Sequence, residues 1–174
     1  SNICDIKVSN LEPKYQAAYT KAIAEYQDYM KFNADSSNGQ MNISIFHMRR
    51  KDMDKAKEAL RRVIKIDNHF NQAKINLAHI YAINGEYKEA EKLYLDIIKL
   101  EPSFHGTWYN LGLLYSEMKS YLKATEAFKQ ATIREPRNLR IYYNRALCLQ
   151  KIKKYFEAEK VFYQALSVPG IDQR

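Results

Sequence analysis

Several residue types that other folds depend on are scarce in this chain of 174 residues. It has only 5 glycines and 4 prolines, too few for the many tight turns of a β-sandwich or β-barrel. Its two cysteines, Cys4 and Cys148, lie far apart in the sequence and form no disulfide framework. No apolar run approaches the ~18 residues of a membrane span, and no signal peptide is visible. These absences favour a helical globular protein.

The residue patterns of common enzymes are also missing. There is no His-Glu-x-x-His, no pair of metal-spaced cysteines and no Cys-x-x-Cys-His for a c-type haem. Gly106 and Gly112 are not followed by the Lys-Ser/Thr of a phosphate loop. We therefore expect a protein that is not an enzyme and that needs no metal or other cofactor.

What the chain does contain is a repeat of 34 residues. Alanine occupies five positions at that interval, namely Ala22, Ala56, Ala90, Ala124 and Ala158. Apolar and mostly aromatic residues stand three before and four after each alanine, which places them on one face of a helix. A second apolar face precedes it and includes the small residues Ser44, Ala78, Gly112 and Ala146. The pattern predicts antiparallel helix pairs that bury their apolar faces by stacking on neighbouring pairs.

One unit carries a family signature. The segment 108–115 (WYNLGLLY), followed by Tyr121, Ala124, Phe128 and Pro136, closely resembles the tetratricopeptide repeat (TPR). The resemblance implies an all-α, right-handed TPR solenoid of four helix-turn-helix repeats. We place the repeats at 37–70, 71–104, 105–138 and 139–172, the first of them degenerate. Residues 1–36 form an N-terminal segment whose single helix caps the stack.

A second, short resemblance lies in the lead-in to the first repeat. Segment 34–42 (ADSSNGQMN) looks like the stretch before the TPRs at the C-terminus of some bacterial multihaem cytochrome c proteins. It implies that the chain is the C-terminal assembly domain of a larger exported, periplasmic protein. Without that link a cytoplasmic location is the alternative.

In a TPR stack the first helix of each repeat lines the concave face. Four asparagines recur there in register, namely Asn42, Asn76, Asn110 and Asn144. Because an amide both donates and accepts, such a row can pair with the backbone of a bound peptide. The alternative is that asparagine is simply common at this position of the TPR pattern. Side chains expected to add contacts to a peptide or partner helix are Tyr109, Tyr143, Leu113, His79 and Arg140.

The charge pattern bears on the kind of partner. The net charge is +8, but the lysines and arginines gather in two patches, at 47–66 and 139–160. Nucleic-acid binding requires a more continuous basic track, so we expect a protein or peptide partner and no nucleic acid. The clamp that TPR proteins use for chaperone tails is matched at only two of five positions, so we do not expect that ligand.

The last helix is unusual on its outer side. Three aromatic residues are expected to be exposed on it, namely Phe156, Phe162 and Tyr163. Because terminal repeats normally keep a polar outer face, these residues predict a docking surface and self-association through this end. The alternative is that segment 167–174 folds back and covers them.

Overall fold

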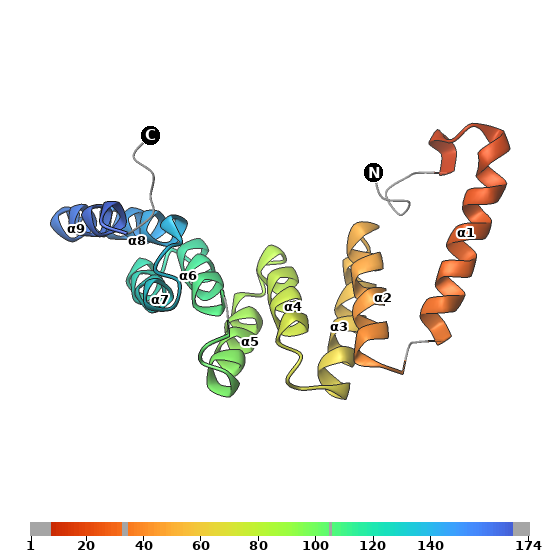
Figure 1. Ribbon diagram of the computed structural model, residues 1–174, viewed down its shortest axis with the longest axis horizontal. Helices are drawn as coiled ribbons and strands as arrows, with labels where there is room; N and C mark the ends of the chain where they lie inside the picture. The colour runs from red at the N-terminus through yellow and green to blue at the C-terminus, as the bar shows by residue number, and fades with distance from the viewer. Residues whose placement is uncertain (1–7, 33–34, 105, 169–174) are drawn as a thin grey trace. The chain divides into compact units, whose positions relative to one another are not determined.

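The computed structural model describes residues 8–32, 35–104 and 106–168, and this part of the chain is helical, with no strand. A short 3-10 helix, η2 (Val8–Asn10), comes first. The α-helices follow in chain order as α1 (Pro13–Phe32), α2 (Ser37–Arg49), α3 (Met53–Ile66), α4 (Asn71–Ile83), α5 (Tyr87–Leu100), α6 (Thr107–Glu117), α7 (Tyr121–Arg134), α8 (Leu139–Lys151) and α9 (Tyr155–Leu166) (Figure 1).

The chain divides into two compact units, residues 1–80 and 81–174, with the division inside α4. Unit 1 holds α1, α2, α3 and most of α4, and unit 2 holds the remaining helices. Our division into repeats starting at 37, 71, 105 and 139 remains a prediction. Parts of its outer segments, residues 1–7, 33–34 and 169–174, lie outside the described residues.

In unit 1, α2 and α3 form a hairpin, and the two helices lie side by side in Figure 1. Ser36 caps α2, because its hydroxyl accepts a hydrogen bond from the Gly39 N–H at 3.0 Å. The carboxylate of Asp52 caps α3 in the same way through the Lys55 N–H at 3.3 Å. Such caps satisfy backbone groups that the first turn of a helix leaves unpaired. Local polar contacts therefore fix the first turn of α2 and the first turn of α3.

Helix α1 packs against α2 along part of its length. Tyr19 is buried, and the ring of Tyr26 lies 5.8 Å from that of Phe46 in α2. Tyr26 and Tyr29 are nevertheless exposed, at 40% and 62%, although they continue the repeat columns. Among the described residues only the short helix η2 precedes α1, and it does not cover these two side chains.

Unit 2 shows the predicted packing most clearly. Ala90, Ala124 and Ala158 are all buried, which lets neighbouring helix backbones approach closely. A Cβ added to Gly112 of α6 would lie 2.6 Å from the Phe128 ring of α7. Since Phe128 is itself fully buried, only glycine fits at position 112 without displacing that ring.

The turns inside the repeats share one backbone geometry. The N–H of Ser120 donates to Tyr115 O at 2.8 Å, and the N–H of Lys154 donates to Leu149 O at 2.9 Å. The residue before each donor takes a positive φ, as in a Schellman C-cap. These residues, 34 apart along the chain, are Lys51 (φ 59°), Gly85 (φ 78°), Lys119 (φ 57°) and Lys153 (φ 61°).

Side-chain contacts to backbone join the end of α7 to the turn between α5 and α6. Glu135 accepts a hydrogen bond from the Gly106 N–H at 2.9 Å. Arg134 donates through Nε to Pro102 O at 2.9 Å and lies over the Trp108 ring at 5.1 Å. These contacts hold the C-terminal end of α7 against the α5–α6 turn and the first turn of α6.

Candidate functional site

In unit 2, α6 and α8 bring six of the predicted site residues together. We call this the α6–α8 face, and its residues are Tyr109, Asn110, Leu113, Arg140, Tyr143 and Asn144. Tyr143 is 54% exposed and Leu113 is 36% exposed, although both are large and apolar or aromatic. Exposed apolar side chains beside amides suit a protein ligand better than a nucleic-acid backbone.

One hydrogen bond ties the two helices of this face together. Asn144 Nδ2 donates to Tyr109 Oη at 3.0 Å, and both side chains are partly buried. One turn from the C-terminal end of these helices, Cys148 Sγ donates to Ser116 Oγ at 3.7 Å. The amide nitrogen of Asn144, predicted to bind a ligand, therefore already has a partner within the protein.

The other polar groups of the face have no such partner. The partly buried Asn110 side chain makes no hydrogen bond within the described part of the chain, and neither does the exposed Arg140 guanidinium.

Aromatic contacts support the face from behind. The Tyr109 ring lies 5.8 Å from Phe128, and the Tyr143 ring lies 6.5 Å from Phe162. Phe162 was expected to be exposed for docking, and that expectation is wrong. It is partly buried because it packs against the core cluster formed by α8 and α9, which includes Ala146 and Val161.

The remaining docking residues are exposed as predicted from the repeat columns. Phe156 is 65% exposed and Tyr163 is 62% exposed on α9. Val168, just beyond α9, packs against the α8–α9 cluster. The rest of the tail that could fold back, from residue 169, lies outside the described residues.

Three of the residues predicted to contact a ligand belong to unit 1. Asn42 is exposed on α2, and His79 is exposed on α4. Asn76 is partly buried, and its Oδ1 accepts a hydrogen bond from Gln72 Nε2 at 3.0 Å. A continuous row through all four asparagines remains a prediction.

Sequence reasoning missed a polar contact between α5 and α6. Tyr115 Oη donates to Glu91 Oε1 at 2.6 Å, and Lys123 Nζ lies 3.5 Å from the same oxygen. Burial, reinforced by that bond, raises the pKa of Tyr115 well above its usual value. Burial also raises the pKa of Tyr94 to about 12. Glu91 stands 24 residues before Tyr115, and no local pattern in the sequence links residues at that distance. The pairing is therefore visible only in the structure.

Reactive groups are inconspicuous in this structure. Burial raises the pKa of the Cys148 thiol, which disfavours the nucleophilic thiolate. Among the described residues, no group of three or more His, Cys, Asp or Glu side chains could hold a metal ion. None of the described helices is long and apolar enough to cross a membrane.

Two shallow hollows lie away from the α6–α8 face. One follows the α7–α8 turn at residues 134–138, and the other is lined by α5 residues such as Leu93 and Asp96. Neither contains any of the predicted site residues.

Comparisons with known proteins agree on the fold. Two crystal structures of MamA align with TM-scores of 0.74 and 0.73, at 24% and 23% sequence identity. The first alignment covers 83% of this chain and 85% of MamA, and the second covers 88% and 84%. At this identity the likeness shows the fold alone, and it confirms the all-α TPR-type solenoid class. No curated protein sequence matches the chain.

The family comparison covers nearly the whole chain. Residues 5–170 match the family described as the tetratricopeptide repeat protein 21 C-terminal ARM domain. The expected TPR relationship is thereby confirmed, whereas the cytochrome resemblance of segment 34–42 gains no support from either comparison. The chain belongs to the tetratricopeptide repeat protein 21 C-terminal ARM domain family.

Proposed function

We propose that the protein is a non-enzymatic interaction module that binds an extended peptide or a partner helix on the α6–α8 face. The observation that carries the proposal is the exposure of Tyr143 and Leu113 beside the unpaired amide of Asn110. Apolar contact area next to a free donor and acceptor is what main-chain recognition requires.

The residues of the face take different parts in this proposal. The Asn110 amide pairs with a backbone N–H and C=O of the ligand, while Tyr143 and Leu113 contact its side chains. Arg140, which has no acidic partner in the described chain, pairs with an acidic side chain of the ligand. Asn144 and Tyr109 hold the two helices in register through their hydrogen bond. Their share in binding comes mainly from apolar contact and from the free amide oxygen of Asn144.

The contacts of unit 1 extend the same proposal. Asn42, Asn76 and His79 lie on first helices at matching repeat positions, so a long ligand that follows the repeats would reach them as well. Each hydrogen bond is worth only ~1 kcal/mol net, so affinity would be modest and shared among contacts.

The test uses peptides selected from a random display library against the wild-type protein. Asn110→Ala should lower the affinity for the selected peptides about fivefold. Combining it with Asn76→Ala should lower the affinity for long peptides further. Tyr143→Ala should cost at least tenfold, because aromatic anchors dominate such interfaces. Asn84→Ala, at an exposed turn outside the face, is the matched control. Unchanged affinity of the Asn110 and Tyr143 variants would refute the proposal.

A second candidate is assembly through α9. Phe156 and Tyr163 are more than half exposed, which is unusual for the outer face of a terminal repeat. Self-association through this face should appear as a concentration-dependent mass in analytical ultracentrifugation. Phe156→Lys or Tyr163→Lys should abolish it, and a wild-type protein that stays monomeric at all concentrations would dismiss the candidate.

A further inference from the structure

Two lysines of unit 2 occupy backbone positions that favour glycine. Lys119 and Lys153 have φ values of 57° and 61°, and the matching residue of the preceding turn is Gly85 at 78°. A side chain is strained in this region, whereas glycine is not. Since the fold accepts glycine at this turn, the strain at positions 119 and 153 points to a use for the lysine side chains.

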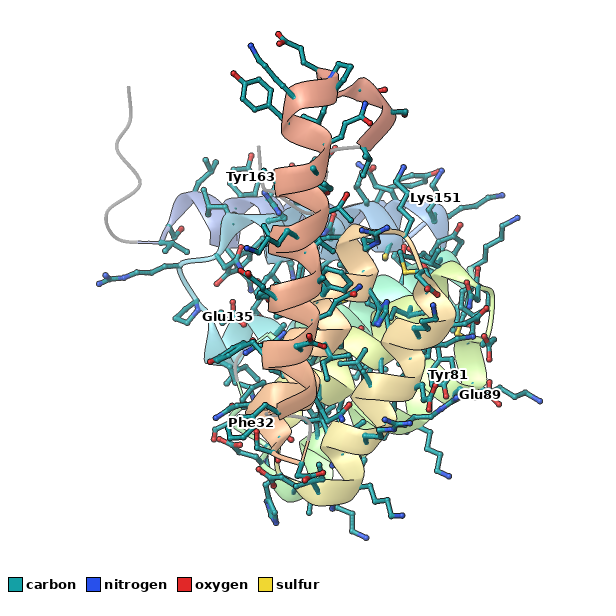
Figure 2. All side chains as sticks on the ribbon, turned by 90° about the vertical axis from the view of Figure 1, so that its right-hand side faces the viewer. Phe32, Tyr81, Glu89, Glu135, Lys151 and Tyr163 are labelled. Atoms are coloured by element: carbon teal, nitrogen blue, oxygen red, sulfur yellow. The ribbon has the colours of Figure 1, made fainter. Side chains whose placement is uncertain are left out.

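The two lysine-bearing turns lie next to each other. Ser116 near the end of α6 contacts Cys148 near the end of α8, with 3.7 Å between Oγ and Sγ. Lys119 follows Ser116 by three positions, and Lys151 follows Cys148 by three. The α6–α7 and α8–α9 turns therefore form one edge of unit 2. Figure 2 shows Lys151 on the opposite side of the molecule from Glu135, which belongs to the turn between repeats.

Large exposed apolar side chains follow these lysines by two or three residues along the chain. Leu122 follows Lys119 at the start of α7 and is 67% exposed. Tyr155 and Phe156 follow Lys153 at the start of α9 and are 64% and 65% exposed. The other turn of unit 2 has Lys88 where these turns have leucine and phenylalanine. The combination is therefore confined to the α6–α7 and α8–α9 turns, which we call the lysine edge.

The cations of this edge are available to a ligand. Lys119, Lys151 and Lys153 are exposed and make no ion pair within the described part of the chain. Segments 117–123 and 151–157 together contain five lysines and two glutamates. Lys154 pairs with Glu157 at 3.3 Å and Lys123 lies 3.5 Å from Glu91, which leaves Lys119, Lys151 and Lys153 against Glu117. The edge therefore keeps a net positive charge.

We propose that the lysine edge docks on a membrane surface rich in anionic lipids. The two hollows described above lie elsewhere in unit 2 and include none of these residues. A bilayer needs no groove, because lysines meet its anionic headgroups while aromatic and aliphatic side chains enter the interface. Nucleic acid also attracts lysines, but only the α8–α9 turn offers exposed aromatic rings for stacking, in Tyr155 and Phe156, whereas the exposed apolar residue of the α6–α7 turn is the aliphatic Leu122.

The experiment is sedimentation of the full chain with vesicles of phosphatidylcholine, with and without phosphatidylserine. We expect binding only when phosphatidylserine is present. Lys119→Gly combined with Lys153→Gly should lower the partition coefficient about 30-fold, since each lysine near the surface contributes about fivefold. Glycine suits both positive φ values, so the melting temperature should stay the same or rise. Leu122→Ser combined with Phe156→Ser should lower binding at least tenfold.

Two matched controls distinguish the effect of the lysine edge on vesicle binding from the effects of overall charge and of exposed apolar surface elsewhere. Lys92→Gln combined with Lys99→Gln removes the same charge from exposed positions of α5 and should change binding less than about threefold. Ile133→Ser removes an apolar side chain that is 66% exposed, about as much as Phe156, from the end of α7 away from the α6–α7 turn, and should leave binding unchanged.

Three results would overturn the proposal. The first is that the wild type does not bind phosphatidylserine vesicles, and the second is that the edge variants bind them as tightly as the wild type does. The third is that the control variants lose as much vesicle binding as the edge variants. Tight binding of single-stranded poly(U) RNA that needs Lys119 and Lys153, with no vesicle binding, would assign the edge to nucleic acid instead.

Discussion

The two units build the same repeat with different core residues. In α2 of unit 1, three inward columns are occupied by Gln40, Ser44 and His47. The matching positions of α6 in unit 2 hold Trp108, Gly112 and Tyr115. Gln40 and Ser44 are buried despite their polarity, and His47 is partly buried. The 34-residue pattern therefore tolerates polar side chains in its core.

The polar contacts of the two units also differ in range. In unit 1, Ser44 Oγ donates to Met41 O at 2.7 Å, three residues away, and His47 Nδ1 lies 3.7 Å from Asp52 Oδ2. In unit 2, hydrogen bonds such as Asn144 to Tyr109 and Tyr115 to Glu91 join successive repeats. Since repeat proteins gain stability from interfaces between neighbours, we expect unit 2 to unfold at higher urea concentration than unit 1.

The largest expected effect comes from removing the central aromatic residue of unit 2. Phe128 is fully buried, so Phe128→Ala should lower the free energy of unfolding by about 4 kcal/mol. Leu60 fills the same repeat position in unit 1 and is also fully buried, so Leu60→Ala should cost about 3 kcal/mol. Urea denaturation measures both, and a loss under about 1 kcal/mol for Phe128→Ala would show that the α6–α7 core is loosely packed.

The next effect tests the tightest contact between helices. Gly112→Ala places a methyl group against Phe128, which should cost about 2 kcal/mol of strain, offset in part by the better helix propensity of alanine. A net loss of about 1 kcal/mol is expected in urea denaturation. Ser44→Ala at the same position of α2 needs no extra room and should change stability by under about 1 kcal/mol. Equal effects at the two positions would contradict the difference in packing.

A smaller effect should come from the bond that joins α6 and α8. Tyr109→Phe and Asn144→Ala should each cost about 1 kcal/mol, because both remove one hydrogen bond between partly buried groups. In a double-mutant cycle the two losses should not add, since the bond can be lost only once. Full additivity would mean that the hydrogen bond contributes nothing to stability.

The outcome at particular residues shows how far the sequence can predict this fold. The burial of Ala90, Ala124 and Ala158 could be predicted because helical spacing is a local property of the chain. The partner of Asn144 could not, because it depends on a tyrosine 35 residues away. Phe162 was expected on the surface although its repeat column holds buried residues such as Phe128, and contacts with Tyr143 and the α8–α9 core partly bury it. Local pattern thus predicts helices and faces, whereas hydrogen-bond partners depend on which repeats meet.

The smallest expected effect is a pH dependence confined to unit 1. Burial lowers the pKa of His47 below its usual value of 6.5, and the attraction of Asp52 only partly opposes this. The unfolded chain therefore binds the proton more readily than the folded one as pH falls through 6.5. Protonation then favours the unfolded state, so unit 1 loses stability below that pH until the folded histidine is also charged.

The matched variant for this effect is His47→Tyr, because Tyr81 and Tyr115 occupy the same position in the next two repeats. Tyrosine stays neutral throughout the acid range, so the variant should lose the slope of unfolding free energy that the wild type shows below pH 6.5. Urea denaturation at a series of pH values measures that slope. Unit 2 has no histidine among its described residues, so its transition should show no slope of this origin, and a slope shared by both units would assign the effect elsewhere.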